Sequence, residues 1–113
     1  MAELTVQEVL LTGLAPAYVA AAVGGDYFVN DGKTFLEARN ASAGAITVTI
    51  TSQEACDQGF THNPAVVVPI TTGQRMIGPF SRKRFNDANG RVQIAYSDVT
   101  TFTVAAIKVD DGV

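Results

Sequence analysis

The sequence has little of the chemistry that most enzymes and metal sites require. Among its 113 residues there are one cysteine, one histidine and no tryptophan, and 17% of the residues are charged. One thiol cannot form an internal disulfide framework, and one histidine cannot supply a multi-histidine metal site. The formal net charge of -3 gives no general attraction to nucleic acid or anionic lipid. We therefore expect no catalytic residues, no cofactor, no bound metal, and neither nucleic acid nor membrane as a partner.

Long hydrophobic runs are also missing. The least polar stretch, residues 10–25, is interrupted by Gly13 and Pro16. Ahead of it stand Glu3 and Glu8, where a signal peptide would carry lysine or arginine. A membrane-spanning helix needs about 18 or more apolar residues in succession, and no stretch provides them. We expect the protein to fold in a reducing cytoplasm, with Cys56 as a free thiol.

The length of the chain and the spacing of its turn residues are typical of one folded domain. With 47% hydrophobic residues, a chain of this length can bury roughly two thirds of its unfolded surface. From Asp26 onward, turn residues recur every eight to twelve positions or so, which is typical of an all-β sandwich. We predict a single β-sandwich, jelly-roll or immunoglobulin-like, over residues 26–109, with an N-terminal arm over 1–25 and a flexible tail over 110–113.

Alternation with period two indicates the strands. It is clearest in residues 45–51, where Ile46, Val48 and Ile50 would face inward and the intervening threonines outward. The predicted strands are 27–29, 34–39, 45–51, 66–70, 74–80, 91–96 and 101–109, and the polar segment 52–64 is predicted as the longest loop. The predicted core consists of Phe35, Ile46, Val48, Ile50, Val67, Ile77, Phe80, Val92, Ile94, Phe102, Val104 and Ile107.

The arm carries the only helix signal. Thr5-x-x-Glu8 has the spacing of a capping box, and Gly13 would end a helix of about two turns, although the valines and threonines equally allow a strand. The arm has more aliphatic side chains than so short a helix buries on one side. It either plugs its own sandwich or contacts a neighbouring subunit. Its candidate contact residues are Leu4, Val6, Val9, Leu10, Leu14 and Tyr18.

Two polar clusters are candidates for chemistry or binding. Cys56, Asp57 and His62 share a loop, but a nucleophile or metal site there would need a second histidine or more carboxylates, so we interpret the loop as solvated. Arg82-Lys83-Arg84 is the one concentrated charge feature. These three cations either contact an acidic protein surface or phosphates, or they keep a sheet edge from aggregating.

Four stretches together carry a family resemblance: VQEVLLTGLAPAYVAA, GDYFVNDGKTFLEARNASAGAITVTI, PITTGQRMIGPF and FNDANGRVQIAYSDVTTFTVAAIKV. The chain resembles a group of small β-sandwich proteins encoded beside the major capsid protein of tailed bacteriophages, several of which are head decoration, or cement, proteins. The resemblance implies a virion protein that is made in the bacterial host cytoplasm. It also implies binding to the major capsid protein on the outer capsid surface, commonly as a homotrimer, and stabilisation of that capsid. It assigns no function to any single residue.

Two other functions remain open from the sequence. A head-tail connector or a tail component of similar fold would have the same strand pattern but a lower copy number. A carbohydrate- or receptor-binding module would usually stack sugar rings on exposed aromatics, and this chain has no tryptophan and only three tyrosines.

Overall fold

The chain folds as a sandwich of two packed β-sheets, as predicted. The computed structural model describes residues 2–55, 57–70 and 73–109, and its dimensions are 39 × 39 × 20 Å. Sheet A has the strand order β1 (Ala2–Glu3), β4 (Asp26–Val29), β9 (Arg91–Tyr96), β6 (Ile46–Ile50) and β7 (Ala65–Val68). Sheet B has the order β2 (Val6–Val9), β10 (Phe102–Val109), β5 (Thr34–Asn40) and β8 (Gly73–Ile77), and β3 (Val19–Ala20) also pairs with β10.

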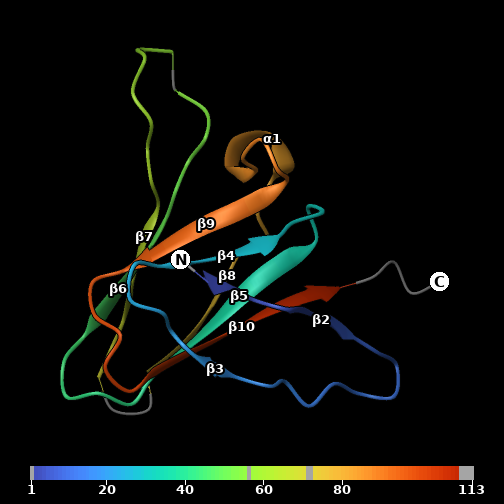
Figure 1. The fold of residues 1–113 in the computed structure, drawn as a ribbon, viewed down its shortest axis with the longest axis vertical. Helices are drawn as coiled ribbons and strands as arrows, with labels where there is room; N and C mark the ends of the chain where they lie inside the picture. The colour runs from blue at the N-terminus through green and yellow to red at the C-terminus, as the bar shows by residue number, and fades with distance from the viewer. Residues whose placement is uncertain (1, 56, 71–72, 110–113) are drawn as a thin grey trace.

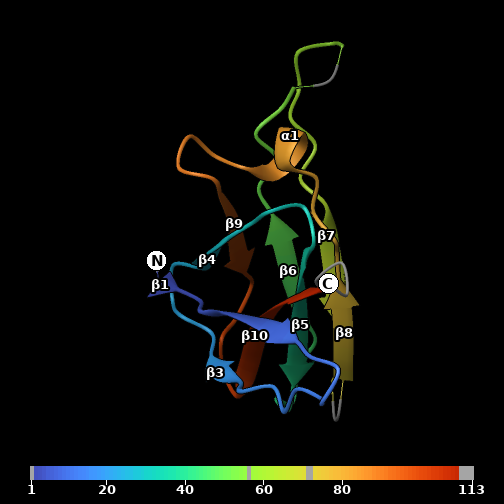
Figure 2. The same cartoon turned by 90° about the vertical axis from the view of Figure 1, so that its right-hand side faces the viewer.

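The chain passes repeatedly from one sheet to the other. From β4 onward the hairpin between β6 and β7 stays within sheet A, whereas every other connection crosses between the sheets (Figures 1 and 2). The long polar segment is the β6–β7 connection, residues 51–64, and we call it the excursion. It projects beyond the sheets at the top of Figure 1. Its described part contains one isolated bridge, between Ala55 and Thr61, in agreement with the predicted loop.

The core lies between the sheets and is built from alternate strand positions. In β6 the isoleucines and the valine are at most 1% exposed, while both threonines are half-buried on the other face, as the alternation predicted. Burial of each of these isoleucine and valine side chains contributes about 1.5–3 kcal/mol to the stability of the fold. The predicted residues found in the core cluster are Ile46, Val48, Ile50, Ile77, Phe80, Val92, Ile94, Phe102 and Val104.

Two predicted core residues are not buried. Val67 is 56% exposed, so its assignment to the core was wrong; its neighbour Val68 is the buried residue. Phe35 is only half-buried, and the adjacent Leu36 faces the core instead. Both errors concern runs of adjacent apolar residues, which do not reveal the phase of a strand. Ile107 is buried as predicted, at 3% exposure, although it pairs with Phe35 on the other face of sheet B from Val104 and Ala106.

The predicted helix near the N-terminus does not form. Residues 6–9 are β2, which runs parallel to β10 with Val6 opposite Ala106 and Val9 opposite Val109. A two-turn helix is marginal in isolation, whereas the edge of β10 offers backbone partners along the whole strand. The capping-box prediction was therefore wrong, and the strand alternative is correct. The predicted tail, 110–113, lies outside the described residues.

One short helix, α1 (Arg82–Phe85), forms at the predicted basic cluster, where the sequence analysis placed no element. The side chain of Ser81 caps it by accepting a hydrogen bond from the Arg84 amide at 3.3 Å. Phe85 anchors it, because its ring packs edge-on against Phe80 at 5.6 Å. Tertiary packing therefore holds the single turn of α1 in place.

Candidate protein-contact sites

The arm is integrated into its own sandwich. β1 extends sheet A, whereas β2 and β3 lie along the same edge of β10 in sheet B. The chain between β1 and β2 crosses from one sheet to the other (Figure 2). Leu4, at the crossing, is 5% exposed and belongs to the core, and its amide donates to the Tyr27 carbonyl at 2.8 Å. Val6 packs half-buried against the same cluster. These two candidate contact residues are thus engaged within the chain.

Several other aliphatic side chains of the arm are exposed to solvent. Val9 is 42% exposed, Leu10 53% and Leu11 102%, and the parallel pairing places Val9 opposite Val109, itself 49% exposed. We call these four residues the exposed arm cluster. Leu14 is half-buried. Leu11 was not among the predicted contact residues, although it is the most exposed large apolar side chain among the described residues.

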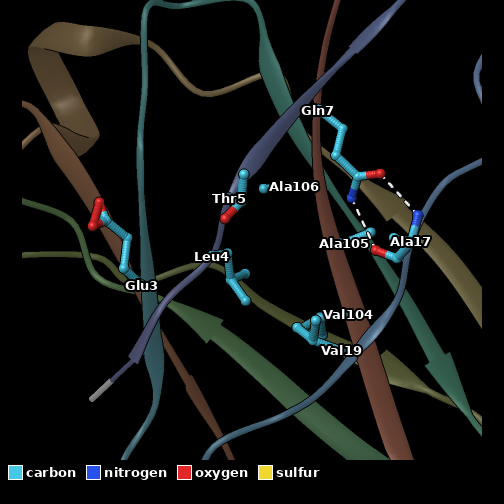
Figure 3. A pocket seen from close by; sticks show the side chains of 9 residues that line it. All are labelled: Glu3, Leu4, Thr5, Gln7, Ala17, Val19, Val104, Ala105 and Ala106. Carbon is cyan, nitrogen blue, oxygen red and sulfur yellow. Dashed lines mark hydrogen bonds between the residues drawn. The ribbon is translucent and has the colours of Figure 1, made fainter.

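A small cavity opens where β2 and β3 meet on the edge of β10. Figure 3 shows the residues that line it: Glu3, Leu4, Thr5 and Gln7 from the first part of the arm, Ala17 and Val19 from the second, and Val104, Ala105 and Ala106 from the middle of β10. Its volume is about 320 Å³. The Gln7 amide closes one side, because it donates to the Ala17 carbonyl at 2.9 Å and accepts from the Ala17 amide at 2.8 Å. The cavity is largely apolar.

Tyr18 joins the arm to the outer face of sheet B. Its hydroxyl donates to Glu37 Oε1 at 2.7 Å, and the Arg39 guanidinium lies over its ring, 4.8 Å from the centroid. The side chain of Gln74 also donates to Glu37 Oε1. Burial, together with the hydrogen bond to Glu37, raises the pKa of Tyr18 above its usual value. The carboxylate of Glu37, only 3% exposed, is therefore solvated by the protein instead of by water.

The basic cluster lies at the base of the excursion and holds part of it. Arg84 donates to the His62 carbonyl at 2.9 Å, and Lys83 forms an exposed ion pair with Glu54 at 3.6 Å. All three cationic residues are exposed, and no ion pair within the described part of the chain engages Arg82. At the far end of the excursion Phe60 is 64% exposed. Phe60 was not among the predicted contact residues, although a lone aromatic residue in a polar loop is a detectable signal.

The cluster of Cys56, Asp57 and His62 does not form a described site. Cys56 lies outside the described residues, and Asp57 and His62 are both exposed. Within residues 2–55, 57–70 and 73–109, no group of three or more His, Cys, Asp or Glu residues is placed to hold a metal ion. Over the same ranges, no helix is long and apolar enough to cross a membrane.

An ionisable pair, Asp26 on β4 and the half-buried Tyr96 on β9, joins these two neighbouring strands of sheet A. Asp26, 1% exposed, accepts from the Tyr96 hydroxyl at 2.7 Å and from the Ala22 amide at 3.3 Å. Burial, with a smaller contribution from Asp26, raises the pKa of Tyr96 well above its usual range. The pair is closed to substrate and connects the end of the arm to β4 and β9. We assign it a structural role.

Comparisons of this chain with known protein families, with curated proteins and with solved structures find no match.

Proposed function

We propose that this protein is a non-enzymatic virion protein that binds the major capsid protein on the outside of a tailed-phage capsid and stabilises the capsid. The observation that carries the proposal is the exposed arm cluster, Val9, Leu10, Leu11 and Val109, on a framework that is otherwise tightly packed. Contiguous apolar side chains at the surface mark protein contacts. A preformed sandwich loses little conformational entropy when it docks, so a small apolar contact can be effective.

The proposal includes assembly as a homotrimer. Three copies bound at once multiply a weak contact, because the second and third attachments become intramolecular. The arm cluster and Phe60 are the apolar groups that we expect to contact the capsid or a neighbouring copy, with the cations of α1 at the rim. Synthesis in the bacterial cytoplasm precedes attachment to the capsid surface in this scheme.

The first test is the copy number in purified particles of the phage that carries this gene. Particles are banded on a density gradient, and this chain is quantified against the major capsid protein by mass spectrometry. A ratio approaching one copy per capsid subunit supports decoration. About a dozen copies or fewer per particle would instead support a connector or tail component. Absence from the particle would refute a virion role altogether.

The second test assigns the contact surface. Particles lacking the protein are incubated with the purified full chain, and attachment is measured by co-sedimentation. We expect Leu11→Ser to weaken attachment, whereas Val23→Ser, at a site that is 83% exposed in a different turn, serves as the matched control and should leave it unchanged. Equal attachment of both variants would show that the exposed arm cluster is not the contact.

A further inference from the structure

A second surface, at the end of the sandwich opposite α1, has the features of a binding groove. It is formed where β5 ends and where β8 and β10 begin, at the bottom of Figure 1. The groove has a volume of about 350 Å³. Its polar side chains come from Arg39, Gln74, Thr101 and Thr103, and we call it the Arg39 groove.

Arg39 is held in position without an acidic partner of its own. It is exposed, its guanidinium lies over the Tyr18 ring, and it forms no ion pair within the described residues. The nearest carboxylate along the strand, Glu37, accepts hydrogen bonds from Tyr18 and Gln74. Stacking uses the face of a guanidinium, so the N–H groups of Arg39 that do not interact with the Tyr18 hydroxyl are available for an acceptor.

Two hydroxyl groups line the same groove. The side chains of Thr101 and Thr103 make no hydrogen bond within the described residues, although each hydroxyl can donate one. Arg39 and Thr103 are register partners on adjacent strands, so their side chains share one face of sheet B. The groove thus brings a cation and hydroxyl donors together around space for a ligand.

Thr101 has a strained backbone. Its φ of 50° is the one positive value at a non-glycine residue among the described residues. For a β-branched residue this conformation is a genuine outlier, and glycine or asparagine would adopt it at lower cost. The turn is held by the Ala41 amide, which donates to the Thr101 carbonyl at 3.1 Å. Backbone strain of this kind is concentrated at binding sites, because the side chain needed there is one that the local backbone conformation disfavours.

We propose that the Arg39 groove binds a carboxylate side chain from an acidic segment of a partner protein. A single guanidinium with neutral donors beside it matches the charge and the hydrogen-bonding pattern of one carboxylate. The carboxylate on the β9–β10 turn, Asp98, already accepts from the amides of Val99 and Thr100 and from the Thr100 hydroxyl. The inference does not depend on attachment to a capsid.

The test uses the ¹⁵N-labelled full chain and an acetylated tetraglutamate peptide, with tetraglutamine as the uncharged control. We expect tetraglutamate to shift the backbone amides around residues 39–41, 73–74 and 101–103, with an affinity that falls as salt is added. Arg39→Gln should reduce the affinity about tenfold or more, and Arg39→Lys should restore only part of it. Arg75→Gln, which removes a nearby exposed arginine, is the matched control and should bind as the parent does.

Thr101→Gly separates binding from folding. Because glycine tolerates the positive φ, this variant should unfold at the same or a higher temperature than the parent while binding tetraglutamate more weakly. Equal shifts with tetraglutamine, unchanged binding by Arg39→Gln, or shifts confined to residues 82–84 would each overturn the proposal. Tighter binding of tripolyphosphate at the same amides would overturn the assignment of a carboxylate, and so would the absence of any shift with tetraglutamate.

Discussion

Replacing Leu4 by alanine tests whether the arm is a structural part of its own sandwich. The side chain is 5% exposed and belongs to the core, and it also lines the cavity of about 320 Å³ in Figure 3. Truncation removes three carbon atoms from apolar contact and enlarges a cavity that the strand pairing on both sides keeps from collapsing. We expect the free energy of unfolding to fall by about 2–4 kcal/mol. For a domain of this size that corresponds to a melting temperature lower by roughly 8–16 °C.

The assay is thermal and urea denaturation of the purified chain, followed by circular dichroism. Leu11→Ala is the matched control, since the same chemical change at a side chain that is 102% exposed should alter the free energy by less than about 0.5 kcal/mol. Deleting residues 1–20 removes β1, β2 and β3 together and should abolish cooperative unfolding. If Leu4→Ala unfolds like the parent, or if the truncated chain stays folded but fails to assemble, the arm acts between subunits and the reasoning is refuted.

Two further predictions concern the Tyr96 hydroxyl and the glycine at the start of β8. Burial raises the folded pKa of Tyr96 above its unfolded value of 10.0, so stability should be retained below about pH 10 and lost as the pH rises further. At pH 7, Tyr96→Phe should lower the free energy of unfolding by about 1–3 kcal/mol, because Asp26 loses a hydrogen-bond donor. Between about pH 8 and pH 11, the melting temperature of this variant should fall by less than that of the parent. Gly73→Ala should destabilise by about 1–3 kcal/mol, because an added Cβ would lie 1.9 Å from the Pro69 carbonyl oxygen. Gly44→Ala, with open space around its Cβ, should melt within a few degrees of the parent and is the control for the glycine change.

The strands with strict alternation were predictable to within one or two residues at their ends. The predicted strand 91–96 matches β9, and the predicted strand 45–51 differs from β6 by one residue at each end. Their apolar residues recur at every second position and can satisfy only one burial pattern. The turn at Asn30-Asp31-Gly32 has the backbone that its residues favour, because its glycine has a φ of 92° and the Asn30 side chain accepts from the Gly32 amide. It connects β4 of sheet A to β5 of sheet B, however, and does not close the hairpin that these residues favour.

The candidate contact residues were only partly predictable. The sequence identified an arm rich in aliphatic residues, but it could not separate Leu4, which is buried, from Leu11, which is fully exposed. Both are leucines in an irregular segment, and their burial depends on which strand edge the arm meets. Similarly, the sequence indicated three exposed cations but not their contacts within the chain. Lys83 and Arg84 contact the excursion from a helix that no periodicity indicated.

The class of fold and the position of most strands can be inferred from the amino-acid sequence, because they follow from local alternation and from turn residues whose backbone preferences are intrinsic. The path of the arm and the phase of β7 cannot be inferred in this way, since both depend on the backbone partner that each segment finds in space. The Arg39 groove also depends on the tertiary structure. It combines Arg39, Gln74 and Thr101, which lie far apart in the chain and meet only because β5 lies between β8 and β10 in sheet B.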